Sequence, residues 1–315
     1  MDHRIVIIGM GNIGKRHLQA VSGLKLPIEI VCYDINRETV KGVVEFCRLN
    51  AIATKDIVLL SNYDEAIGAI GPRSIVIVAT TAQGRKQVLR DVIGRKPDVV
   101  IAEKPLCQNL ADYDEIISLA GKSGVPVYID FNRHAFEVYK QIKEEISAAA
   151  EKTFFAVFPD GMACIGIHIL DLMTWLLSAR EFKLLSSKAF GLCETKRPGC
   201  HDFYGEMVVA LDSGSLAFLD AARGENVYSV KIVTRAKEYN VFEFTKKMVV
   251  VDSSNRLTVR EIEVPFISQT TGRIVADIIE AKKVPDLPTI EQSYLAHKIL
   301  FEYMESNSLE NANIT

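Results

Sequence analysis

Several features that would mark a membrane, secreted or nucleic-acid-binding protein are missing from this sequence. Its formal net charge at pH 7 is −3, which gives no reason to expect nucleic acid or an anionic membrane as a partner. No apolar run is long enough to span a bilayer, and a strand-like pattern begins almost at once in place of an apolar leader. We therefore expect a cytoplasmic protein with no membrane and no nucleic-acid partner.

Cysteine is sparse and unclustered. The six cysteines stand at Cys32, Cys47, Cys107, Cys164, Cys193 and Cys200, with no CxxC pair among them. A disulfide framework is not expected in a chain of 315 residues, so we expect reduced thiols. No group of cysteines and histidines has the spacing of a zinc site, and we predict no bound metal.

In the first half of the chain, short apolar runs alternate regularly with helix-compatible stretches. Short apolar runs occupy residues 4–9, 28–33, 74–79, 97–102 and 125–131, and helix-compatible stretches at 12–22, 36–49, 83–94 and 110–122 separate them. Apolar strands that alternate with helices are typical of a parallel sheet covered on both faces. We predict an α/β fold with an N-terminal, doubly wound Rossmann domain over residues 1–131.

The second half has a different pattern from about residue 153. A helix at 165–178 precedes strand candidates at 182–191, 203–211, 215–222, 227–235, 239–245, 247–252 and 256–263. The turns D-S-G at 212–214 and D-S-S-N at 252–255 favour hairpins. We predict a C-terminal α+β domain over residues 132–315, built on a large, mostly antiparallel open sheet. Helices at 272–282 and 289–306 close the chain and could pack back on the first domain.

The first strand ends in a glycine-rich turn, Gly9-Met10-Gly11-Asn12-Ile13-Gly14. GxGxxG is a weak signal alone, but here it follows a strand and opens a helix, which is the context of a dinucleotide site. The glycines allow a tight turn and a close approach to a pyrophosphate, and the helix N-terminus offers N–H groups to the phosphates. We predict that Gly9, Gly11, Asn12, Ile13 and Gly14 bind the cofactor.

The second strand is followed by an acid. Asp34 lies 25 residues after Gly9, near the place of a carboxylate that binds a ribose 2′-hydroxyl and repels a 2′-phosphate. This favours NAD over NADP, although the neighbouring Arg37 could accept that phosphate. A helix-capping role for Asp34 is compatible with the same position.

The stretch A-E-K-P-L at 102–106 places Lys104 directly after a buried strand. Parallel strands deliver ligand contacts at their carboxyl ends, and Pro105 restricts the backbone of Lys104. An ammonium there could bind a substrate hydroxyl and serve as an acid or base. The alternative is a solvated lysine at a strand end, and Glu103 is expected to orient the loop.

The helix at 165–177 is apolar nearly all round, yet Cys164, His168, Asp171 and Trp175 fall on one stripe. An ionised Asp171 in a dry core would cost several kcal/mol, so it needs a partner or a wet cleft. Either His168 and Asp171 meet substrate hydroxyls, or the two form a hydrogen-bonded structural His–Asp pair.

Taken together, three segments resemble the Gfo/Idh/MocA family of oxidoreductases: G-M-G-N-I-G-K-R-H at 9–17, A-E-K-P-L at 102–106 and G-I-H-I-L-D-L-M-T-W-L-L at 166–177. Their order and spacing agree with that family along nearly the whole chain. The resemblance implies a nicotinamide cofactor on the first domain and a sugar or polyol between that domain and the sheet of the second. It also implies a homo-oligomer, a dimer or a tetramer.

The resemblance also implies roles for single residues. Lys104 and His168 would be catalytic, and Glu103 and Lys104, with Thr80 and Thr81 of the stretch A-T-T-A-Q-G-R-K at 79–86, would line the cofactor. The substrate candidates are Asn132, Arg133, Cys164 and Asp171. Many family members carry an aspartate where this chain has Cys164, and a thiol with an ordinary pKa cannot replace a carboxylate at neutral pH. Asp160 would compensate only if its loop bent inward, and His201 and Asp202 are further candidates for the cleft.

We therefore predict an oxidoreductase that transfers a hydride between a nicotinamide cofactor and a CH–OH or ketone group of a sugar, polyol or nucleotide sugar. His168 would take the hydroxyl proton, Lys104 would hold the same oxygen, and Asp171 would position a neighbouring hydroxyl. Two alternatives remain open. One is a glycosidase that uses NAD only transiently. The other is a dinucleotide-binding protein in which the change at Cys164 marks lost chemistry.

Overall fold

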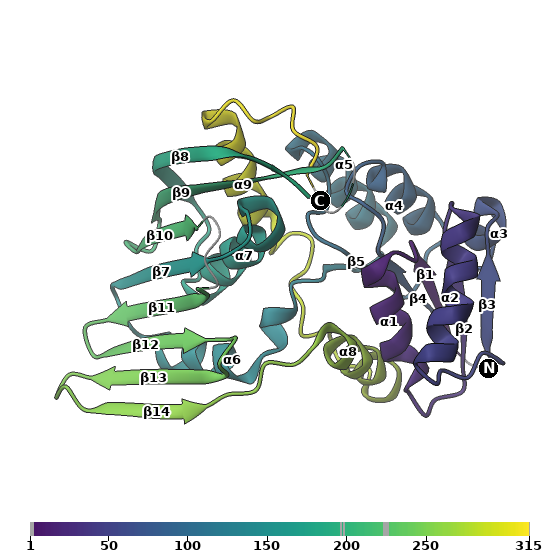
Figure 1. Ribbon diagram of the computed structural model, residues 1–315, viewed down its shortest axis with the longest axis horizontal. Helices are drawn as coiled ribbons and strands as arrows, with labels where there is room; N and C mark the ends of the chain where they lie inside the picture. The colour runs from purple at the N-terminus through teal and green to yellow at the C-terminus, as the bar shows by residue number, and fades with distance from the viewer. Residues whose placement is uncertain (1–2, 196, 198, 223–226, 315) are drawn as a thin grey trace. The chain divides into compact units, whose positions relative to one another are not determined.

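A computed structural model describes residues 3–195, 197, 199–222 and 227–314 (Figure 1). The chain forms two compact units. The first runs through Asn132 and also takes in Pro265–Gln292, and the second consists of Arg133–Val264 and the segment from Ser293 onward. Each unit is described by itself below.

The first unit is built on a six-stranded sheet with the order β3-β2-β1-β4-β5-β6. All its strand pairs are parallel. The strands are β1 (His3–Ile8), β2 (Ile28–Tyr33), β3 (Ile57–Leu60), β4 (Ser74–Val78), β5 (Val99–Ala102) and β6 (Val127–Ile129). This order reverses between β1 and β4, which is where doubly wound sheets bind ligands at the strands' carboxyl ends.

Six helices belong to the described part of this unit: α1 (Asn12–Ser22), α2 (Arg37–Leu49), α3 (Tyr63–Gly68), α4 (Arg85–Gly94), α5 (Leu110–Ser123) and α8 (Ile267–Ala281). Apolar side chains of α1, α2 and α8 form one core with alternate residues of the sheet, such as Ile5, Ile7 and Ile77. The helix α8 comes late in the chain but packs on α1, where a side chain on Gly272 would lie 3.2 Å from the Ala20 carbonyl.

The predicted Rossmann domain is confirmed, with two omissions. The strand β3 and the helix α3 were not predicted, because β3 is only four residues long and its residues are only partly buried. The helix α8 begins at Ile267 rather than at residue 272, because the Gln269 side chain accepts a hydrogen bond from the Phe266 backbone N–H at 2.9 Å and caps the helix earlier.

The second unit is built on an eight-stranded sheet with the order β14-β13-β12-β11-β7-β10-β9-β8. The strands are β7 (Lys152–Phe158), β8 (Phe182–Glu194), β9 (His201–Leu211), β10 (Leu216–Ala221), β11 (Ser229–Thr234), β12 (Lys237–Phe242), β13 (Lys247–Asp252) and β14 (Leu257–Glu261). The β7–β10 pair is parallel and the other pairs are antiparallel. The predicted mostly antiparallel sheet is therefore confirmed.

The central strand β7 was not predicted, although its sequence K-T-F-F-A-V-F is rich in aromatic residues. Its neighbours in the sheet are β10 and β11, which follow it by more than 50 residues in the chain. A strand without a hairpin partner next to it in sequence lacks the turn signal on which the other assignments rest.

The helical elements of the second unit cover one face of its sheet. They are the 3-10 helix η1 (Asn132–Ala135, which starts at the unit boundary), α6 (Glu137–Glu145), the π-helix η2 (Met162–Gly166), α7 (Ile167–Leu176) and α9 (Tyr294–Ser306). Burial alternates along β7, so Phe154, Ala156 and Phe158 are buried, while Phe155 between them is 37% exposed.

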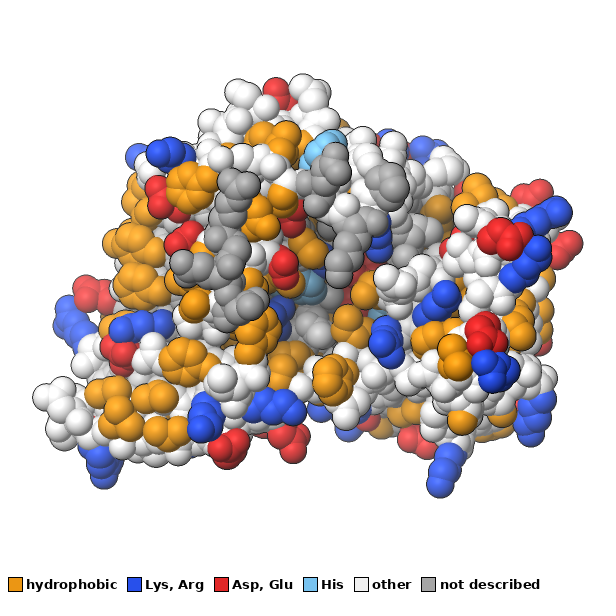
Figure 2. All heavy atoms as spheres, in the orientation of Figure 1, with side chains coloured by type: hydrophobic (Ala, Val, Ile, Leu, Met, Phe, Trp, Pro, Cys, Tyr) orange, Lys and Arg blue, Asp and Glu red, His pale blue; other side chains and the backbone are white. Residues whose placement is uncertain are grey.

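The opposite face of this sheet carries exposed apolar side chains. The strand register places on this face Phe155 of β7, Leu216 and Phe218 of β10, and Leu257 and Val259 of β14, all of which are exposed. Figure 2 shows hydrophobic side chains gathered over the strands near both ends of this sheet. Among the described residues, no helix combines the length and apolarity needed to cross a bilayer.

Candidate active site

The glycine-rich turn after β1 has the geometry that its sequence predicts. Gly9 has a φ of +96°, and a side chain there would lie 2.8 Å from the backbone of Ala79 and Thr80. A side chain on Gly14 would lie 1.9 Å from the Gly9 carbonyl oxygen. By contrast, a Cβ on Gly11 meets no described atom within 4 Å. Gly9 and Gly14 are thus required by close packing, and Gly11 leaves open space over the turn.

The helix α1 begins in this open space. Its first residue, Asn12, is exposed, and Gly11 at the N-cap carries no side chain that could satisfy the first N–H groups. An uncapped N-terminus that follows a parallel strand is suited to bind a phosphate, because its N–H groups and the helix dipole favour an anion.

Asp34 follows β2 and is fixed by two backbone bonds. One carboxylate oxygen accepts from the Met10 N–H at 2.7 Å, and the other accepts from the Asn36 N–H at 2.8 Å. Asn36, not Asp34, is the residue that caps α2. Asp34 therefore joins the glycine turn to the end of β2. Each oxygen keeps further acceptor capacity, and Arg37 lies exposed in the first turn of α2.

Lys104 stands where its sequence position predicts, immediately past the carboxyl end of β5. Two backbone bonds hold this strand end between its neighbours: Glu103 N–H donates to Val78 O at 3.0 Å, and Asp130 N–H donates to Ala102 O at 2.8 Å. The peptide bond between Lys104 and Pro105 is cis. Lys104 itself is half-buried.

A buried arginine ties this loop to the loop after β4. The guanidinium of Arg85 donates to the carbonyl oxygens of Thr80, Glu103 and Pro105, and its side chain is 1% exposed. The sequence analysis assigned no role to Arg85. The feature that could have indicated this role is an arginine in the first turn of a helix, directly after the loop that begins A-T-T. Thr80 and Thr81, the predicted ribose contacts, lie in the loop that it holds.

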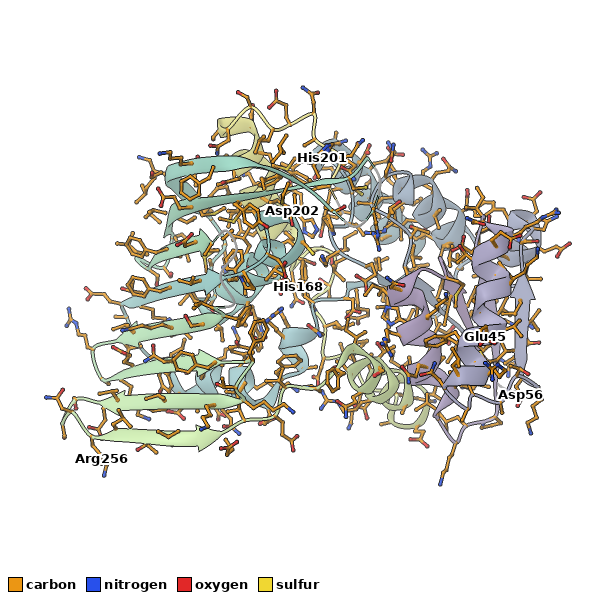
Figure 3. All side chains as sticks on the ribbon, in the orientation of Figure 1. Glu45, Asp56, His168, His201, Asp202 and Arg256 are labelled. Atoms are coloured by element: carbon orange, nitrogen blue, oxygen red, sulfur yellow. The ribbon has the colours of Figure 1, made fainter. Side chains whose placement is uncertain are left out.

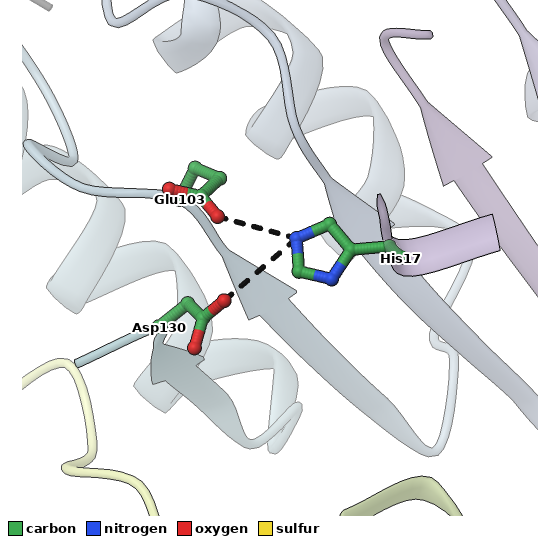
Figure 4. A group of neighbouring side chains, drawn as sticks. All are labelled: His17, Glu103 and Asp130. Carbon is green, nitrogen blue, oxygen red and sulfur yellow. Dashed lines mark hydrogen bonds and ion pairs between the residues drawn. The ribbon is translucent and has the colours of Figure 1, made fainter. Parts of the chain in front are cut away.

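Glu103 enters a buried cluster with His17 of α1 and Asp130 at the end of β6 (Figure 4). His17 Nε2 lies 3.2 Å from Glu103 Oε1 and 3.7 Å from Asp130 Oδ2. The other ring nitrogen, Nδ1, lies 3.0 Å from the Thr271 hydroxyl on α8. The sequence analysis used the histidine only as the last letter of the motif at 9–17 and did not consider Asp130.

Burial and mutual charge shift the titration of all three groups. Burial and the adjacent Glu103 carboxylate raise the pKa of Asp130 to about 7, against the opposing effect of His17 and Lys104. Burial alone would lower the pKa of His17, but Glu103 and Asp130 raise it overall. Burial alone would raise the pKa of Glu103, but His17, Lys104 and Arg85 lower it overall. Asp130 is therefore the member of the cluster whose pKa lies near neutrality.

In the second unit, Asp171 has a partner other than His168. Its carboxylate lies 2.8 Å from Nε2 of His134, whose ring stacks on Trp175 with centroids 4.2 Å apart. Burial raises the pKa of Asp171, and the interaction with His134 opposes this. Asp171 is thus paired with a histidine, but this is His134 of η1, which the sequence analysis did not consider, and not the expected His168.

The backbone beside Cys164 is bound by a carboxylate from another strand. Asp202 of β9 accepts from the Ala163 N–H at 2.8 Å and from the Cys164 N–H at 3.1 Å. It can approach because position 161 is glycine: a side chain there would lie 2.2 Å from the Asp202 carboxylate. Asp202, and not the exposed Asp160, is therefore the acid that caps the start of η2.

Figure 3 labels His168 on α7, and His201 and Asp202 at the start of β9. His168 and His201 are half-buried, whereas Asp202 is buried. His168 lies one turn after Cys164 on the continuous η2–α7 segment, so the Asp202 cap also fixes the helix that carries His168.

Arg133 is also occupied within the second unit. Its guanidinium makes a two-bond pair with Glu243, at 2.8 and 2.9 Å. The hydroxyls of Tyr139 and Tyr228 donate to the same carboxylate at 2.7 and 3.2 Å. All four side chains are buried. Arg133 therefore organises an internal polar cluster, and Asn132, beside it in sequence, is half-buried.

The strand order of the first unit, the shape of the glycine turn and the uncapped helix α1 define a dinucleotide-binding Rossmann protein. Residues 3–131 match the family model described as "Oxidoreductase family, NAD-binding Rossmann fold". The resemblance to the Gfo/Idh/MocA oxidoreductases is thereby confirmed for residues 3–131.

The individual proteins that resemble this chain have low sequence identity to it. The chain is 27% identical over 143 residues to myo-inositol 2-dehydrogenase of Thermotoga maritima, a match that covers 45% of this chain and only 40% of that enzyme. The structure is similar to UDP-N-acetylglucosamine 3-dehydrogenase of Acidithiobacillus ferrooxidans, with a TM-score of 0.76, 14% identity, and 99% and 100% of the two chains covered. It is also similar to a Synechocystis biliverdin reductase with biliverdin and NADP+, with a TM-score of 0.72, 12% identity, and 98% and 100% covered. At these identities the two structures support the fold alone.

Proposed function

We propose that this protein is a nicotinamide-dependent oxidoreductase acting on a CH–OH or ketone group of a sugar, polyol or nucleotide sugar, in the cytoplasm. The observation that carries the proposal is the arrangement at the carboxyl edge of the first sheet: an open glycine turn under an uncapped helix, with Lys104 at the end of β5. The names of two relatives, an inositol dehydrogenase and a nucleotide-sugar dehydrogenase, support the substrate class.

The residues of the first unit fit a bound dinucleotide. The N–H groups at the start of α1 would hold the pyrophosphate, and the loop with Thr80 and Thr81 would lie along the nicotinamide ribose. Asp34 favours NAD over NADP, because an anchored carboxylate accepts from a ribose 2′-hydroxyl and repels a 2′-phosphate. When bound, the nicotinamide ring supplies the hydride acceptor or donor.

The chain's own residues would bind and deprotonate the substrate. The Lys104 ammonium would donate a hydrogen bond to the reacting oxygen, and His168 would take the hydroxyl proton at a ring nitrogen. Asn132 and Cys164 stay candidates for direct contact with the substrate. Asp171 and Arg133 would act instead by positioning, since their charged groups bind His134 and Glu243.

A panel of sugars, polyols and nucleotide sugars with NAD and with NADP, followed by absorbance of the reduced cofactor, tests this function. The Lys104→Met variant should retain NADH binding, measured by fluorescence, and lose most turnover, while Lys122→Met on the exposed side of α5 should keep both. Unchanged turnover in Lys104→Met contradicts the assigned role. NADH binding without turnover on any compound contradicts the proposed reaction.

A further inference from the structure

A buried histidine–aspartate pair of the second unit has no chemical step in the proposed reaction. The Asp171 carboxylate of α7 lies 2.8 Å from Nε2 of His134, which belongs to the 3-10 helix η1. The side chains of Asp171 and His134 are 2% and 10% exposed. One carboxylate oxygen is thus committed to the histidine, and Asp171, nearly closed off from solvent, is poorly placed to meet a ligand itself.

The His134 ring is held in one orientation. Its face stacks on the indole of Trp175, with ring centroids 4.2 Å apart and ring planes 25° apart. Trp175 follows Asp171 by one turn of α7, so a single helix holds both the edge and the face of the imidazole. Lys143 of α6 fixes the indole in turn, because its ammonium lies 5.0 Å from the ring centroid and donates to the Trp175 carbonyl oxygen. A ring restrained in this way presents its remaining atoms in a defined direction.

The carboxylate also decides which ring nitrogen carries the proton. An ionised carboxylate only accepts hydrogen bonds, so it selects the tautomer with the proton on Nε2 and leaves a lone pair on Nδ1. With Nε2 taken by Asp171, Nδ1 is the ring nitrogen left for a ligand, and the remaining exposure of the side chain lets a small polar group reach the ring. A carboxylate that orients a histidine in this manner recurs in enzymes of unrelated folds.

This imidazole lies beside the turn of α7 that carries His168. His168 and Asp171 are three residues apart on one helix, so their side chains leave α7 on the same side. The sequence analysis expected Asp171 to position a hydroxyl next to the reacting one. The structure uses that carboxylate for His134 instead, which makes His134 the polar group that can take over this contact.

We propose that His134 is a substrate-binding residue, whose Nδ1 accepts a hydrogen bond from a hydroxyl on the carbon next to the reacting CH–OH or ketone carbon. Asp171 and Trp175 are its positioning residues. This inference rests on the proposed function and narrows the substrate class to compounds with two neighbouring hydroxyls, or with a hydroxyl beside a ketone. A compound without the second hydroxyl leaves the nitrogen unpaired, which is unfavourable in a site with little water.

Labelling with diethyl pyrocarbonate examines the nitrogen without any substrate. The reagent acylates neutral imidazoles, and peptide mass spectrometry quantifies each histidine after about pH 7.5 treatment, where an ordinary imidazole is mostly neutral. His134 should be labelled, whereas His17 and His297, which are fully buried, should not. In Asp171→Asn the new amide can donate to Nε2 and hold the proton on Nδ1, so the label on His134 should fall by about threefold or more.

His3 of the first unit is the internal reference, and its labelling should be the same in the wild type and in Asp171→Asn. Wild-type protein without a label on His134, or a label that Asp171→Asn leaves unchanged, overturns the proposal. If Asp171→Asn does not fold, the wild-type labelling and the variants of His134 still decide it.

Two variants separate contact with the substrate from support of the fold. Glutamine at His134 can place its amide near the position of Nε2 and still donate to Asp171, but it has no atom at the position of Nδ1. His134→Gln should therefore keep the melting temperature and lower kcat/KM by about tenfold or more. His134→Asn, which places its amide near Nδ1 and loses the bond to Asp171, should melt lower but retain more turnover. A His134→Gln variant as active as the wild type overturns the contact.

The readout that a purely structural role would not move is discrimination between substrates. Each sugar or polyol of the panel that is turned over is compared with its deoxy analogue that lacks the hydroxyl next to the reacting carbon. The ratio of the two kcat/KM values should be about tenfold or more in the wild type and in the control His3→Gln, and close to one in His134→Gln. Equal ratios in the wild type and His134→Gln overturn the proposal. If the wild type turns over no compound, the proposed function fails and the substrate contact with it, while the labelling still reports whether Asp171 orients His134.

Discussion

Arg85 donates hydrogen bonds to the backbone carbonyl of Glu103, the residue immediately before Lys104. The same guanidinium also binds the carbonyls of Thr80 and Pro105. One buried side chain thus joins the loop after β4 to the loop after β5. The position of Lys104 therefore depends on a residue of α4 that need not touch any ligand.

Replacing Arg85 by methionine should destabilise the protein by about 3 kcal/mol, because three buried carbonyls lose a charged donor. NADH binding should weaken as well, since both loops lie at the cofactor edge. Thermal unfolding and NADH fluorescence measure the two effects. The control is Arg90→Met, a change on the same helix as Arg85 that breaks an exposed ion pair with Glu115 of α5. It should change the free energy of unfolding by less than about 1 kcal/mol. Equal effects of the two variants would refute the clamp.

Gly161→Ala should cost about 2–4 kcal/mol, because the new methyl group would occupy the space of the Asp202 carboxylate. Relief of the clash requires Asp202 to leave the N–H groups of Ala163 and Cys164. The control is Gly121→Ala in the last turn of α5, at an exposed position where a Cβ meets no described atom within 4 Å. That change should stabilise the helix by about 0.5–1 kcal/mol. Chemical denaturation measures the free energy of unfolding of both variants. A Gly161→Ala variant as stable as the wild type would rule out the capping of Ala163 and Cys164 by Asp202.

The stability of the protein should fall as pH rises from about 4 to about 8. Asp130 has a folded-state pKa of about 7 against an ordinary value of 3.8, so the native state binds more protons than the unfolded state in that window. The raised pKa of His17 acts in the same direction at higher pH. Because Asp130→Asn cannot ionise, its melting temperature relative to the wild type should increase from pH 5 to pH 8. A constant or decreasing difference would contradict the shift.

The exposed sheet face should mediate self-association with a second copy of the chain, which is the homo-oligomer that the family resemblance implies. Phe155 and Phe218 stack there with ring centroids 5.0 Å apart and are 37% and 36% exposed. Phe218→Glu should shift the sedimentation profile toward monomer. Val284→Glu changes an exposed apolar residue of the first unit and should not. A wild-type protein that sediments as a monomer even at high concentration would contradict self-association through this face.

Much of the architecture could be predicted from local patterns. Isoleucine and valine runs, helix periods and hairpin turns place most of the strands and helices within a few residues of their bounds, and the G-x-G-x-x-G turn carries its own geometry. Among the elements that were not predicted, β7 has no sequence neighbour as its sheet partner. Its position between β10 and β11 follows from sheet assembly rather than from local preference.

The sequence by itself determined the period of each element, the glycine turn and the place of Lys104 after a buried strand, because these depend on residues close together in the chain. Only the tertiary structure decided which charged groups are partners. His17 meets Glu103 and Asp130, Asp171 meets His134 rather than His168, and Arg133 meets Glu243. Such pairs are set by strand order and helix packing, which bring together side chains that are far apart in sequence, and burial then makes each pairing energetically necessary.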